Sequence, residues 1–352
     1  MLVKQYINDI MNDKRRGVLS LMVKPLLLFV SCIYGFLVRG SYFFYKVNLL
    51  KSYKVPVTVL SVGNITLGGT GKTPFAIMLS RRLAQKRGKT AVLIRGYGED
   101  EWKMLEEKLT GSGIKVFVGR NRVKSAEEAL QEGVENIILD DGFQHRRLRR
   151  DLDIVLLDAA SPFGNRHFFP RGILREPLAG LRRAGVIVLT KVDRAGDKAR
   201  KTEEEIKRIA PGKAILKAVH RPKHLCDVWK GGIEALSLVN GRKVCALSAI
   251  CDASYFRHTL ERTGACVELE FVFPDHHPYK RRDLERIFKA CRKKKIDSII
   301  TTEKDAVKLK KFRFFEAGSA CRILALAIEL EITEGEDSLD AEISRLHRGG
   351  SC

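Results

Sequence analysis

Short apolar runs alternate with charged segments along most of the chain. The first series comprises residues 57–62, 90–96, 115–119, 135–141, 153–159 and 186–191, and the second 214–219, 243–250, 266–273, 297–302 and 322–330. Runs of this length, bounded by turn residues and interleaved with charged helical stretches, are typical of a mainly parallel sheet with helices on both faces. The pattern therefore predicts an α/β fold with a second, smaller α/β domain.

The first run leads into a glycine-rich loop, SVGNITLGGTGKTP, after which helical spacing resumes at Phe75. In such a strand–loop–helix turn, backbone N–H groups surround a phosphate, the lysine reaches its outer oxygens and the threonine hydroxyl binds Mg²⁺. The residues expected to hold a nucleoside triphosphate in this way are Gly68, Gly69, Thr70, Gly71, Lys72 and Thr73. An ordinary glycine-rich turn is the alternative, but the intact GKT between a strand and a helix favours phosphate binding.

The run ENIILDDGFQH ends in Asp140 and Asp141. An acidic residue at the end of a strand downstream of a phosphate loop is placed to hold Mg²⁺. Both carboxylates can face one site only if the strand ends there and the chain turns, which Gly142 permits. A strand-end cap is the alternative, and the upstream loop favours metal.

The stretch RGYGEDEW also follows an apolar run and offers Asp100 as the carboxylate that orients an acceptor hydroxyl and takes its proton. Acidic residues in the first turn of a helix are the alternative, because they interact favourably with its dipole.

In the second series, FPDHHPY offers two adjacent histidines whose spacing does not favour a metal site. We expect one of them to lie near Asp100 and support its proton transfer. The segment TTEKDAVKL is interpreted as a helix start, with Thr302 as the capping residue and Asp305 three positions later.

The loop FFPRGILREPLAGLRR carries Arg171 and Arg175 beside Glu176, and arginines in a glycine- and proline-containing loop suit phosphate oxygens. Arg182 and Arg183 are expected on a solvated face. The run RRLRR, residues 146–150, has no aromatic interleaving, so an anionic lipid surface is favoured over nucleic acid.

The composition narrows the classes of molecule that the protein is expected to bind. The chain of 352 residues has a formal net charge of +22, which favours polyanions, and its eight cysteines show no C-x-x-C or paired histidine spacing. Residues 25–38 are 14 uncharged positions, too few to span about 30 Å of hydrocarbon. We expect a monotopic helix in a membrane interface, with a buried core helix as the alternative.

Together, the motifs SVGNITLGGTGKTP, RGYG, ILDDGFQHRRLRRDLDIVLLD, FPRGILREP, DHHPY and TTEKDAVKL resemble those of the tetraacyldisaccharide 4'-kinase family, over about residues 20–330. The resemblance implies ATP- and Mg²⁺-dependent phosphorylation of the 4'-hydroxyl of a lipid A disaccharide 1-phosphate. It implies that Lys72 and Thr73 hold nucleotide and metal, that Asp140 and Asp141 bind or position the metal, and that Asp100 is the base with His276 as its partner. The residues expected in the substrate or phosphate region are Arg95, Tyr97, Arg122, Arg171, Arg175 and Glu176.

We therefore predict a P-loop lipid kinase on the cytoplasmic face of an inner membrane, with no nucleic acid and no obligate protein partner. The expected divisions are a membrane-associated helical segment at 1–50, a P-loop kinase domain at 51–215, a smaller α/β domain at 216–332 and a polar, frayed tail at 333–352. The alternative is a regulatory GTPase or NTP-driven switch, which is suggested by the T-K-x-D element of LTKVD at 189–193.

Overall fold

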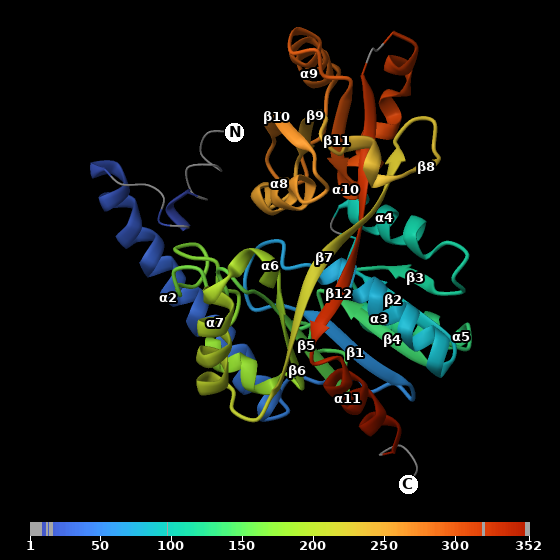
Figure 1. Cartoon of the computed structure of the whole chain (residues 1–352). Coiled ribbons are helices and arrows are strands. Elements are labelled where there is room, and N and C mark those ends of the chain that lie inside the picture. Colours follow the sequence, from blue (N-terminus) through green and yellow to red (C-terminus); the bar gives the residue numbers. More distant parts are fainter. Residues whose placement is uncertain (1–8, 12, 14–16, 97, 319–320, 349–352) are drawn as a thin grey trace. The chain divides into compact units, whose positions relative to one another are not determined.

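The computed structural model describes residues 9–11, 13, 17–96, 98–318 and 321–348, which fold into two units (Figure 1). Unit 1 comprises Met1–Arg95, Gly111–Val219 and Ile332–Cys352, and unit 2 comprises Gly96–Thr110 and His220–Glu331. Residues 96–110, which carry Asp100, thus belong with unit 2, although they lie within the first half of the chain.

The helices and strands of unit 1 are α2 (Val18–Lys46), β1 (Thr58–Gly63), α3 (Lys72–Arg87), β2 (Thr90–Ile94), β3 (Lys115–Val118), α5 (Arg122–Gln131), β4 (Asn136–Asp140), β5 (Leu152–Asp158), η1 (Leu178–Arg183), β6 (Val186–Thr190), α6 (Val192–Ala195), α7 (Asp197–Ile209) and α11 (Glu336–Arg348). Those of unit 2 are α4 (Glu99–Leu109), β8 (Ile233–Glu234), η2 (Leu236–Val239), β9 (Lys243–Ser248), α8 (Ala253–Glu261), β10 (Cys266–Val272), α9 (Arg281–Lys293), β11 (Ser298–Thr302), α10 (Glu303–Leu309) and η3 (Lys310–Gly318). Strands β7 (Ala214–Asp227) and β12 (Arg322–Glu334) run from one unit into the other.

The sheet of unit 1 has the strand order β7-β6-β5-β1-β4-β2-β3, with parallel pairing throughout. Strands β2, β4 and β6 are buried at every residue, as continuous apolar runs in a parallel sheet require. Val62 of β1 pairs with Asp140 of β4, so these neighbouring strands end at the same edge of the sheet. The predicted mainly parallel α/β fold is confirmed.

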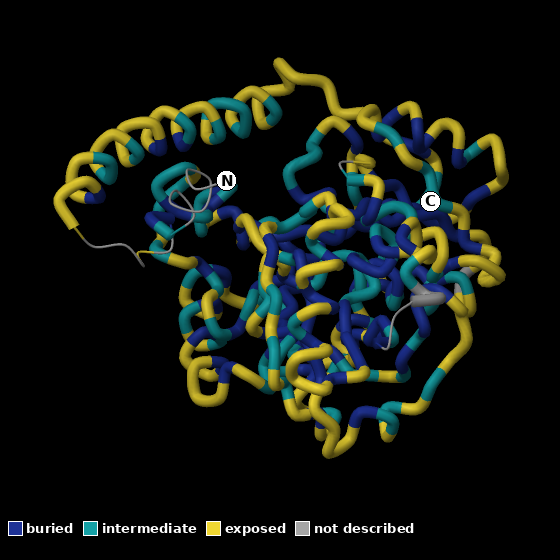
Figure 2. Tube along the Cα trace, turned by 90° about the horizontal axis from the view of Figure 1, so that it is seen from above, coloured by how far each residue is buried: buried dark blue, intermediate teal, exposed yellow. Residues whose placement is uncertain are grey.

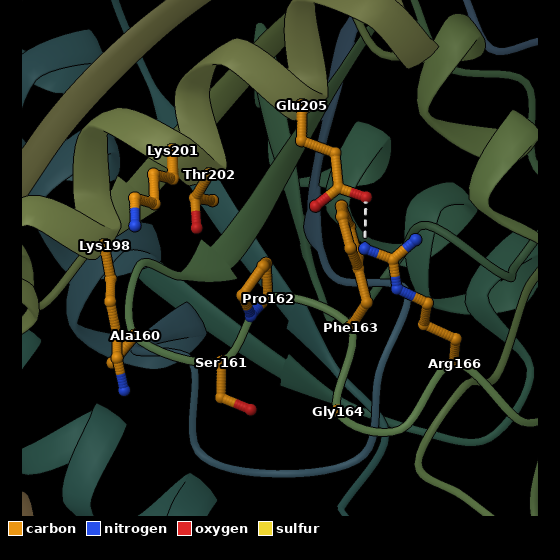
Figure 3. Close-up of a pocket in the computed structure, with 10 residues that line it drawn as sticks. All are labelled: Ala160, Ser161, Pro162, Phe163, Gly164, Arg166, Lys198, Lys201, Thr202 and Glu205. Carbon is orange, nitrogen blue, oxygen red and sulfur yellow. Dashed lines mark hydrogen bonds and ion pairs between the residues drawn. The ribbon is translucent and has the colours of Figure 1, made fainter.

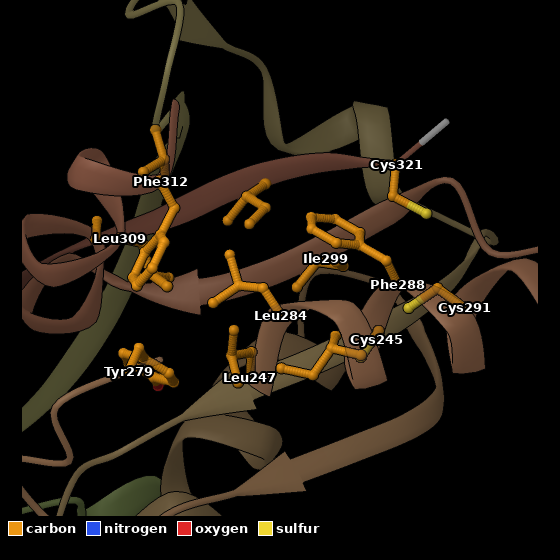
Figure 4. Close-up of a cluster of buried hydrophobic side chains, with 14 of the residues drawn as sticks. Cys245, Leu247, Tyr279, Leu284, Phe288, Cys291, Ile299, Leu309, Phe312 and Cys321 are labelled. Atoms are coloured by element: carbon orange, nitrogen blue, oxygen red, sulfur yellow. The ribbon is translucent and has the colours of Figure 1, made fainter. Parts of the chain in front are cut away.

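Unit 2 is built on the strand order β10-β9-β11-β12-β7, in which β9, β10 and β11 pair in parallel. Figure 4 shows one side of its core, where Leu284 and Phe288 of α9 pack with Leu247 of β9 and Ile299 of β11. The apolar stripe of α9 fixes this packing, because Leu284, Ile287, Phe288 and Cys291 recur at helical spacing.

Helix α2 is longer than the sequence predicts. It continues for 29 residues through Lys24 and Pro25, so it spans about 43 Å at roughly 1.5 Å per residue. The expectation of an apolar segment too short to span a membrane was therefore wrong. By length and composition alone, α2 is long enough and apolar enough to cross a membrane. Lys24 is accommodated by an ion pair with Asp13 at 3.0 Å.

The expected frayed tail was also wrong, because residues 336–348 form α11. Leu339 and Ile343, four positions apart, are buried, and Arg82 of α3 forms ion pairs with Glu336 and Asp340 on the same helix. One buried stripe and a charged anchor are enough to hold a short polar helix against unit 1.

Candidate functional site

The glycine-rich loop follows β1, which lies between β4 on one side and β5 on the other, and the chain crosses from one side of β1 to the other between these two strands. Ligands bind at such switch points in open α/β sheets, at the carboxyl ends of the strands. Gly68 and Gly71 have φ angles of 122° and 84°, which L side chains rarely adopt. Gly71 is the residue before α3, so the loop delivers Lys72 and Thr73 at the N-terminus of that helix.

The two consecutive aspartates reach this loop by different routes. Thr73 Oγ1 donates a hydrogen bond to Asp140 Oδ2 at 2.9 Å. Asp141 follows the end of β4 with a φ of 54°, and this left-handed turn brings its carboxylate to 3.7 Å from Lys72 Nζ. The turn thus begins at Asp141 itself, one residue before the glycine expected to permit it.

Arg175 completes the cluster from the loop before η1. Its Nη1 donates to both carboxylate oxygens of Asp141, at 2.8 and 3.1 Å. Burial alone would raise the pKa of Asp141, but the charges of Lys72 and Arg175 and the Arg175 hydrogen bond outweigh it and lower this pKa. Asp141 is therefore an anion at neutral pH.

The donor set suits a hard cation that also binds phosphate. Thr73 and Asp140 present a hydroxyl and a carboxylate within 2.9 Å of each other beside the phosphate loop. Mg²⁺ is usually held by one or two protein oxygens together with substrate phosphates and water. No group of three His, Cys, Asp or Glu side chains within the described ranges has the arrangement of an all-protein metal site, so this partial coordination is the kind to expect.

Two polar residues that were not among the expected site residues, Asn64 and Gln144, connect this cluster. Asn64 is fully buried; its Nδ2 donates to Thr70 Oγ1 at 3.1 Å and its Oδ1 accepts from Arg175 at 3.3 Å. Gln144 Nε2 donates to the Asn64 carbonyl at 2.7 Å and to Glu176 at 3.0 Å. Their position inside the motifs SVGNITLGG and DDGFQH was the available signal.

His145, another residue that was not among the expected site residues, follows Gln144 in the sequence and is half-buried. Burial, reinforced by the charges of Arg122, Arg150, Arg147 and Arg95, lowers its pKa to about 4. The imidazole is therefore neutral at physiological pH and can act as a hydrogen-bond donor or acceptor rather than as a cation.

Glu176 is fully buried and pairs with Arg183, whose Nη1 lies 2.9 Å from Glu176 Oε2. The interpretation of Arg183 as part of a solvated face was wrong, because it compensates this buried carboxylate. Arg122 is buried as well and donates to the carbonyls of Gly119 and Asp140, at 2.6 and 3.2 Å.

The remaining expected substrate residues occupy different surroundings. Arg95 is exposed just beyond the end of β2, and Tyr97 lies outside the described residues. Arg171 contacts the N-terminal segment: Nη2 donates to Asp13 at 2.8 Å, Nη1 donates to the Ile10 carbonyl at 3.3 Å, and the backbone N–H donates to Ser31 of α2 at 2.8 Å. In unit 1, then, Arg175 lies at the phosphate loop and Arg171 at α2.

Unit 2 brings Asp100 and His276 together from positions 176 residues apart. Asp100 lies in the first turn of α4, and His276 in the loop after β10, where it has a φ of 61°. His276 Nδ1 is 3.1 Å from Asp100 Oδ1. Burial alone would raise the pKa of Asp100, but the His276 hydrogen bond and the charges of Lys304, His276 and Lys308 lower it to about 2.

Gly98 makes this contact possible. A Cβ at residue 98 would lie 2.6 Å from Asp100 Oδ1 and 3.0 Å from His276 Nδ1. Its φ of −170° is accessible to any residue, so the requirement for glycine is the close approach of the pair rather than backbone strain.

A separate cavity of about 250 Å³ lies in unit 1 between the loop after β5 and helix α7 (Figure 3). Lys198, Lys201 and Thr202 of α7 line one side and Ser161 and Phe163 the other, and Arg166 pairs with Glu205 at 2.6 Å. None of the expected site residues lines this cavity.

Known proteins resemble this chain over nearly its whole length. A model of the family described as tetraacyldisaccharide-1-P 4'-kinase (LpxK) matches residues 23–108 and 99–347. The tetraacyldisaccharide 4'-kinase of Anaeromyxobacter sp. (strain Fw109-5) is 38% identical and covers 93% of each chain, and that of Halothermothrix orenii is 32% identical and covers 94% of this chain and 95% of its own.

Among solved structures, LpxK from Aquifex aeolicus in complex with ATP superimposes with a TM-score of 0.70 at 28% identity, covering 92% of this chain and 99% of that chain. The sequence and the fold both match tetraacyldisaccharide 4'-kinases, and these matches do not favour the interpretation as a regulatory switch. The chain belongs to the tetraacyldisaccharide-1-P 4'-kinase family.

Proposed function

We propose that this protein transfers the γ-phosphate of ATP to the 4'-hydroxyl of a tetraacyldisaccharide 1-phosphate and releases ADP and the 1,4'-bisphosphate. The observation that carries the proposal is the cluster of Lys72, Thr73, Asp140 and Asp141 in a chain of this family. A phosphate loop with its lysine, and a hydroxyl and a carboxylate for a metal, are recurring parts of the sites that transfer a phosphoryl group from a nucleotide.

In this proposal, Gly68 to Gly71 surround the phosphates with backbone N–H groups, and Lys72 contacts the outer phosphate oxygens. Thr73 and Asp140 would hold Mg²⁺, which would supply positive charge to the phosphate oxygens. Once nucleotide is bound, Lys72 and Arg175 are shared between Asp141 and the phosphate, so Asp141 orients both cations. Arg95, Arg122 and Glu176 remain candidates for the substrate and phosphate region.

Asp100 is the proposed base. As the 4'-oxygen forms its bond to the γ-phosphorus and the bond from that phosphorus to the ADP oxygen breaks, the hydroxyl proton passes to the Asp100 carboxylate. His276 steadies this carboxylate through the 3.1 Å hydrogen bond between Nδ1 and Oδ1. Asp100 is ionised across the physiological range, so it is in the protonation state that a base requires.

Helix α2 is proposed to dock the enzyme on the cytoplasmic face of a membrane, where an acylated acceptor resides. Figure 2 shows the long helix near the N-terminal end as largely exposed along its length. Its exposed apolar side chains are Val18, Leu19, Leu21, Met22, Leu26, Leu28, Phe29, Val30, Ile33, Phe36, Leu37, Phe43 and Phe44. An exposed stripe of this size, followed by the basic residues Lys46, Lys51 and Lys54, suits an anionic lipid surface.

One face of α2 is fixed to unit 1, which gives the docked protein a defined orientation. Ser31 Oγ donates to the Phe168 carbonyl at 2.7 Å, and the Tyr34 hydroxyl donates to the Arg175 carbonyl at 3.3 Å. Arg175 also binds Asp141, so the membrane helix and the phosphate loop share a supporting segment. This arrangement supports an acceptor that enters from the lipid side.

The test is incubation of the protein with γ-labelled ATP, Mg²⁺ and a tetraacyldisaccharide 1-phosphate in detergent, followed by separation of the lipid products. We expect a labelled bisphosphorylated lipid from the wild type, loss of label with Lys72→Ala, and a large reduction with Asp100→Ala. Unlabelled lipid from folded, nucleotide-binding wild type would overturn the proposal. Preference for GTP without need of the lipid would instead favour a switch.

A further inference from the structure

The segment TTEKDAVKL contains the start of α10, and two of its lysines contact the Asp100–His276 pair within unit 2. The segment starts a capped helix, as its sequence predicts: Thr302 accepts a hydrogen bond from the Asp305 N–H at 3.1 Å. Lys304 and Lys308 lie four positions apart on this helix, so they project from the same side.

Lys304 contacts the histidine of the pair. Its Nζ lies 3.2 Å from His276 Nε2, 2.9 Å from Glu101 Oε1 and 3.1 Å from Asp275 Oδ1. Only 15% of the Lys304 side chain is exposed. Burial alone would lower the pKa of Lys304, but Glu101 and Asp275 raise it, so this lysine is an ammonium group at every physiological pH.

An ammonium group can only donate hydrogen bonds, so the neutral His276 accepts at Nε2 and carries its proton on Nδ1. In this tautomer Nδ1 donates its proton to Asp100 Oδ1, and the two atoms lie 3.1 Å apart. In the other tautomer, a lone pair on Nδ1 would face the Asp100 carboxylate and an N–H would face the ammonium group, which is unfavourable at both ends.

Lys308 contacts the other carboxylate oxygen. Its Nζ lies 3.4 Å from Asp100 Oδ2 and 2.7 Å from Asp305 Oδ1. Asp305 is fully buried and accepts from the Ala249 N–H at 2.8 Å, directly beyond the end of β9. Lys308 is therefore fixed to the sheet of unit 2 through Asp305, and the two oxygens of Asp100 have different, fixed partners.

We propose that Lys304 and Lys308 are positioning residues for phosphoryl transfer: Lys304 sets the tautomer of His276 that donates to Asp100, and Lys308 fixes the second oxygen of Asp100. The proposal rests on the proposed function in that Asp100 takes the hydroxyl proton. It assigns to α10 the orientation of the base, whereas the phosphate loop in unit 1 serves the nucleotide.

The groups that face His276 determine the direction in which its pKa shifts. Asp100 and Glu101 of α4 and Asp275 of its own loop favour the imidazolium form, and Lys304 of α10 opposes it. The Asp100 hydrogen bond is the largest influence and raises the pKa of His276, while burial and Lys304 lower it. Removal of Lys304 therefore leaves burial as the opposing influence and raises the pKa of His276 further.

The first experiment follows His276 directly, with ¹⁵N-labelled histidine in the full-length protein titrated by NMR. We expect the His276 midpoint of Lys304→Met to rise by about one pH unit, because a cation within hydrogen-bonding distance is lost. Lys304→Gln, which keeps a donor without the charge, covers the case in which Lys304→Met does not fold. Lys304→Arg should keep a midpoint near that of the wild type.

The second experiment measures kcat against pH. We expect kcat of Lys304→Met and Lys308→Met to fall about tenfold or more with little change in the KM for ATP. For Lys304→Met, the acidic limb of kcat should move to higher pH together with the NMR midpoint. Lys310→Met is the matched control. Lys310 also contacts α4, through an ion pair with Glu107 at 2.7 Å, but this ion pair involves neither Asp100 nor His276. The kcat of Lys310→Met should therefore equal that of the wild type.

An unmoved His276 midpoint in folded Lys304→Met would overturn the tautomer assignment, as would a fall in kcat with no shift of the acidic limb. A kcat of Lys308→Met equal to that of Lys310→Met would overturn the assignment of Lys308. The NMR titration needs no kinase activity. A shifted midpoint in Lys304→Met, together with a wild type that phosphorylates no lipid, would overturn the proposed function and the catalytic role of this contact but not the tautomer assignment.

Discussion

Asp141 binds Arg175 through both carboxylate oxygens while its own backbone is in the left-handed region, at a φ of 54°. A residue other than glycine in this region is strained, and such strain persists where the surroundings impose it and function uses it. Because of this turn, the consecutive residues Asp140 and Asp141 contact Thr73 and Lys72, respectively.

Asp141→Gly and Asp141→Ala should therefore separate stability from activity. Both remove the carboxylate and should reduce kcat at least 100-fold, since Lys72 and Arg175 lose their shared anion. Glycine adopts the left-handed conformation freely, so Asp141→Gly should be about 1 kcal/mol more stable than Asp141→Ala. Chemical denaturation measures the difference, and equal stabilities of the two variants would argue against strain at this position.

Thr73→Val tests the proposed metal site. The substitution keeps the shape of the side chain but removes the hydroxyl that contacts Asp140, so the variant should need a higher Mg²⁺ concentration and show a lower kcat. The measurement is initial rate against Mg²⁺ concentration at saturating ATP. Thr110→Val, which removes an exposed hydroxyl bonded to the Glu106 carbonyl, is the control and should leave the Mg²⁺ requirement unchanged.

Gly98→Ala tests the close approach of Asp100 and His276. The added methyl group would lie 2.6 Å from Asp100 Oδ1, so the pair must separate. We expect kcat to fall about tenfold or more with the KM for ATP unchanged. Gly40→Ala, where the new methyl group meets no atom within 4 Å, should behave as the wild type. A Gly98→Ala enzyme with full kcat would show that the pair is not needed at this distance.

Acid stability should depend on Asp100. Its folded pKa of about 2 lies below the ordinary value of 3.8, so its stabilising contribution is present above the unfolded pKa and is lost as the pH falls towards 2. Asp100→Asn should be less stable than the wild type by roughly 1 to 2 kcal/mol at pH 7, and this difference should vanish near pH 2. Urea denaturation across this range measures it, and a difference independent of pH would contradict the prediction.

Membrane docking predicts a large effect of polar substitutions on α2. Phe36 and Leu37 are 75% and 63% exposed, and each contributes about 1.5 to 3 kcal/mol when buried in lipid. The double variant Phe36→Ser, Leu37→Ser should bind vesicles containing anionic phosphatidylglycerol more than tenfold more weakly, measured by cosedimentation, with kcat in detergent retained. Ile233→Ser removes an equally exposed apolar side chain from β8 and should not change binding.

The sequence predicted the parallel sheet because its strands are short apolar runs, and it predicted the phosphate loop because one local motif holds every residue. It did not predict the features that depend on contacts between distant parts of the chain. Pro25 hid the continuity of α2, Leu339 and Ile343 were too few to reveal α11, and Pro222 concealed the extension of β7 to Asp227.

The base region shows the same limit. Asp100 could be singled out from its place after an apolar run, and His276 only as one of two histidines. Lys304 and Lys308 looked like ordinary polar positions of a helix, since nothing local marks a lysine whose partner lies 28 or 208 residues earlier. Contacts of this range are set by the topology of unit 2, in which β9, β10 and β11 end at one edge of the sheet.

The docking of α11 on α3 also sets an order of events at the ribosome. Every described strand of unit 2 is synthesised before Glu336, so unit 1 still lacks α11 when the strands of unit 2 have been made. Until α11 emerges, Arg82 lacks both of its carboxylate partners. Unit 1, whose synthesis begins first, is thus also completed last, and a nascent chain stalled before residue 336 would contain every described strand of both units but not α11.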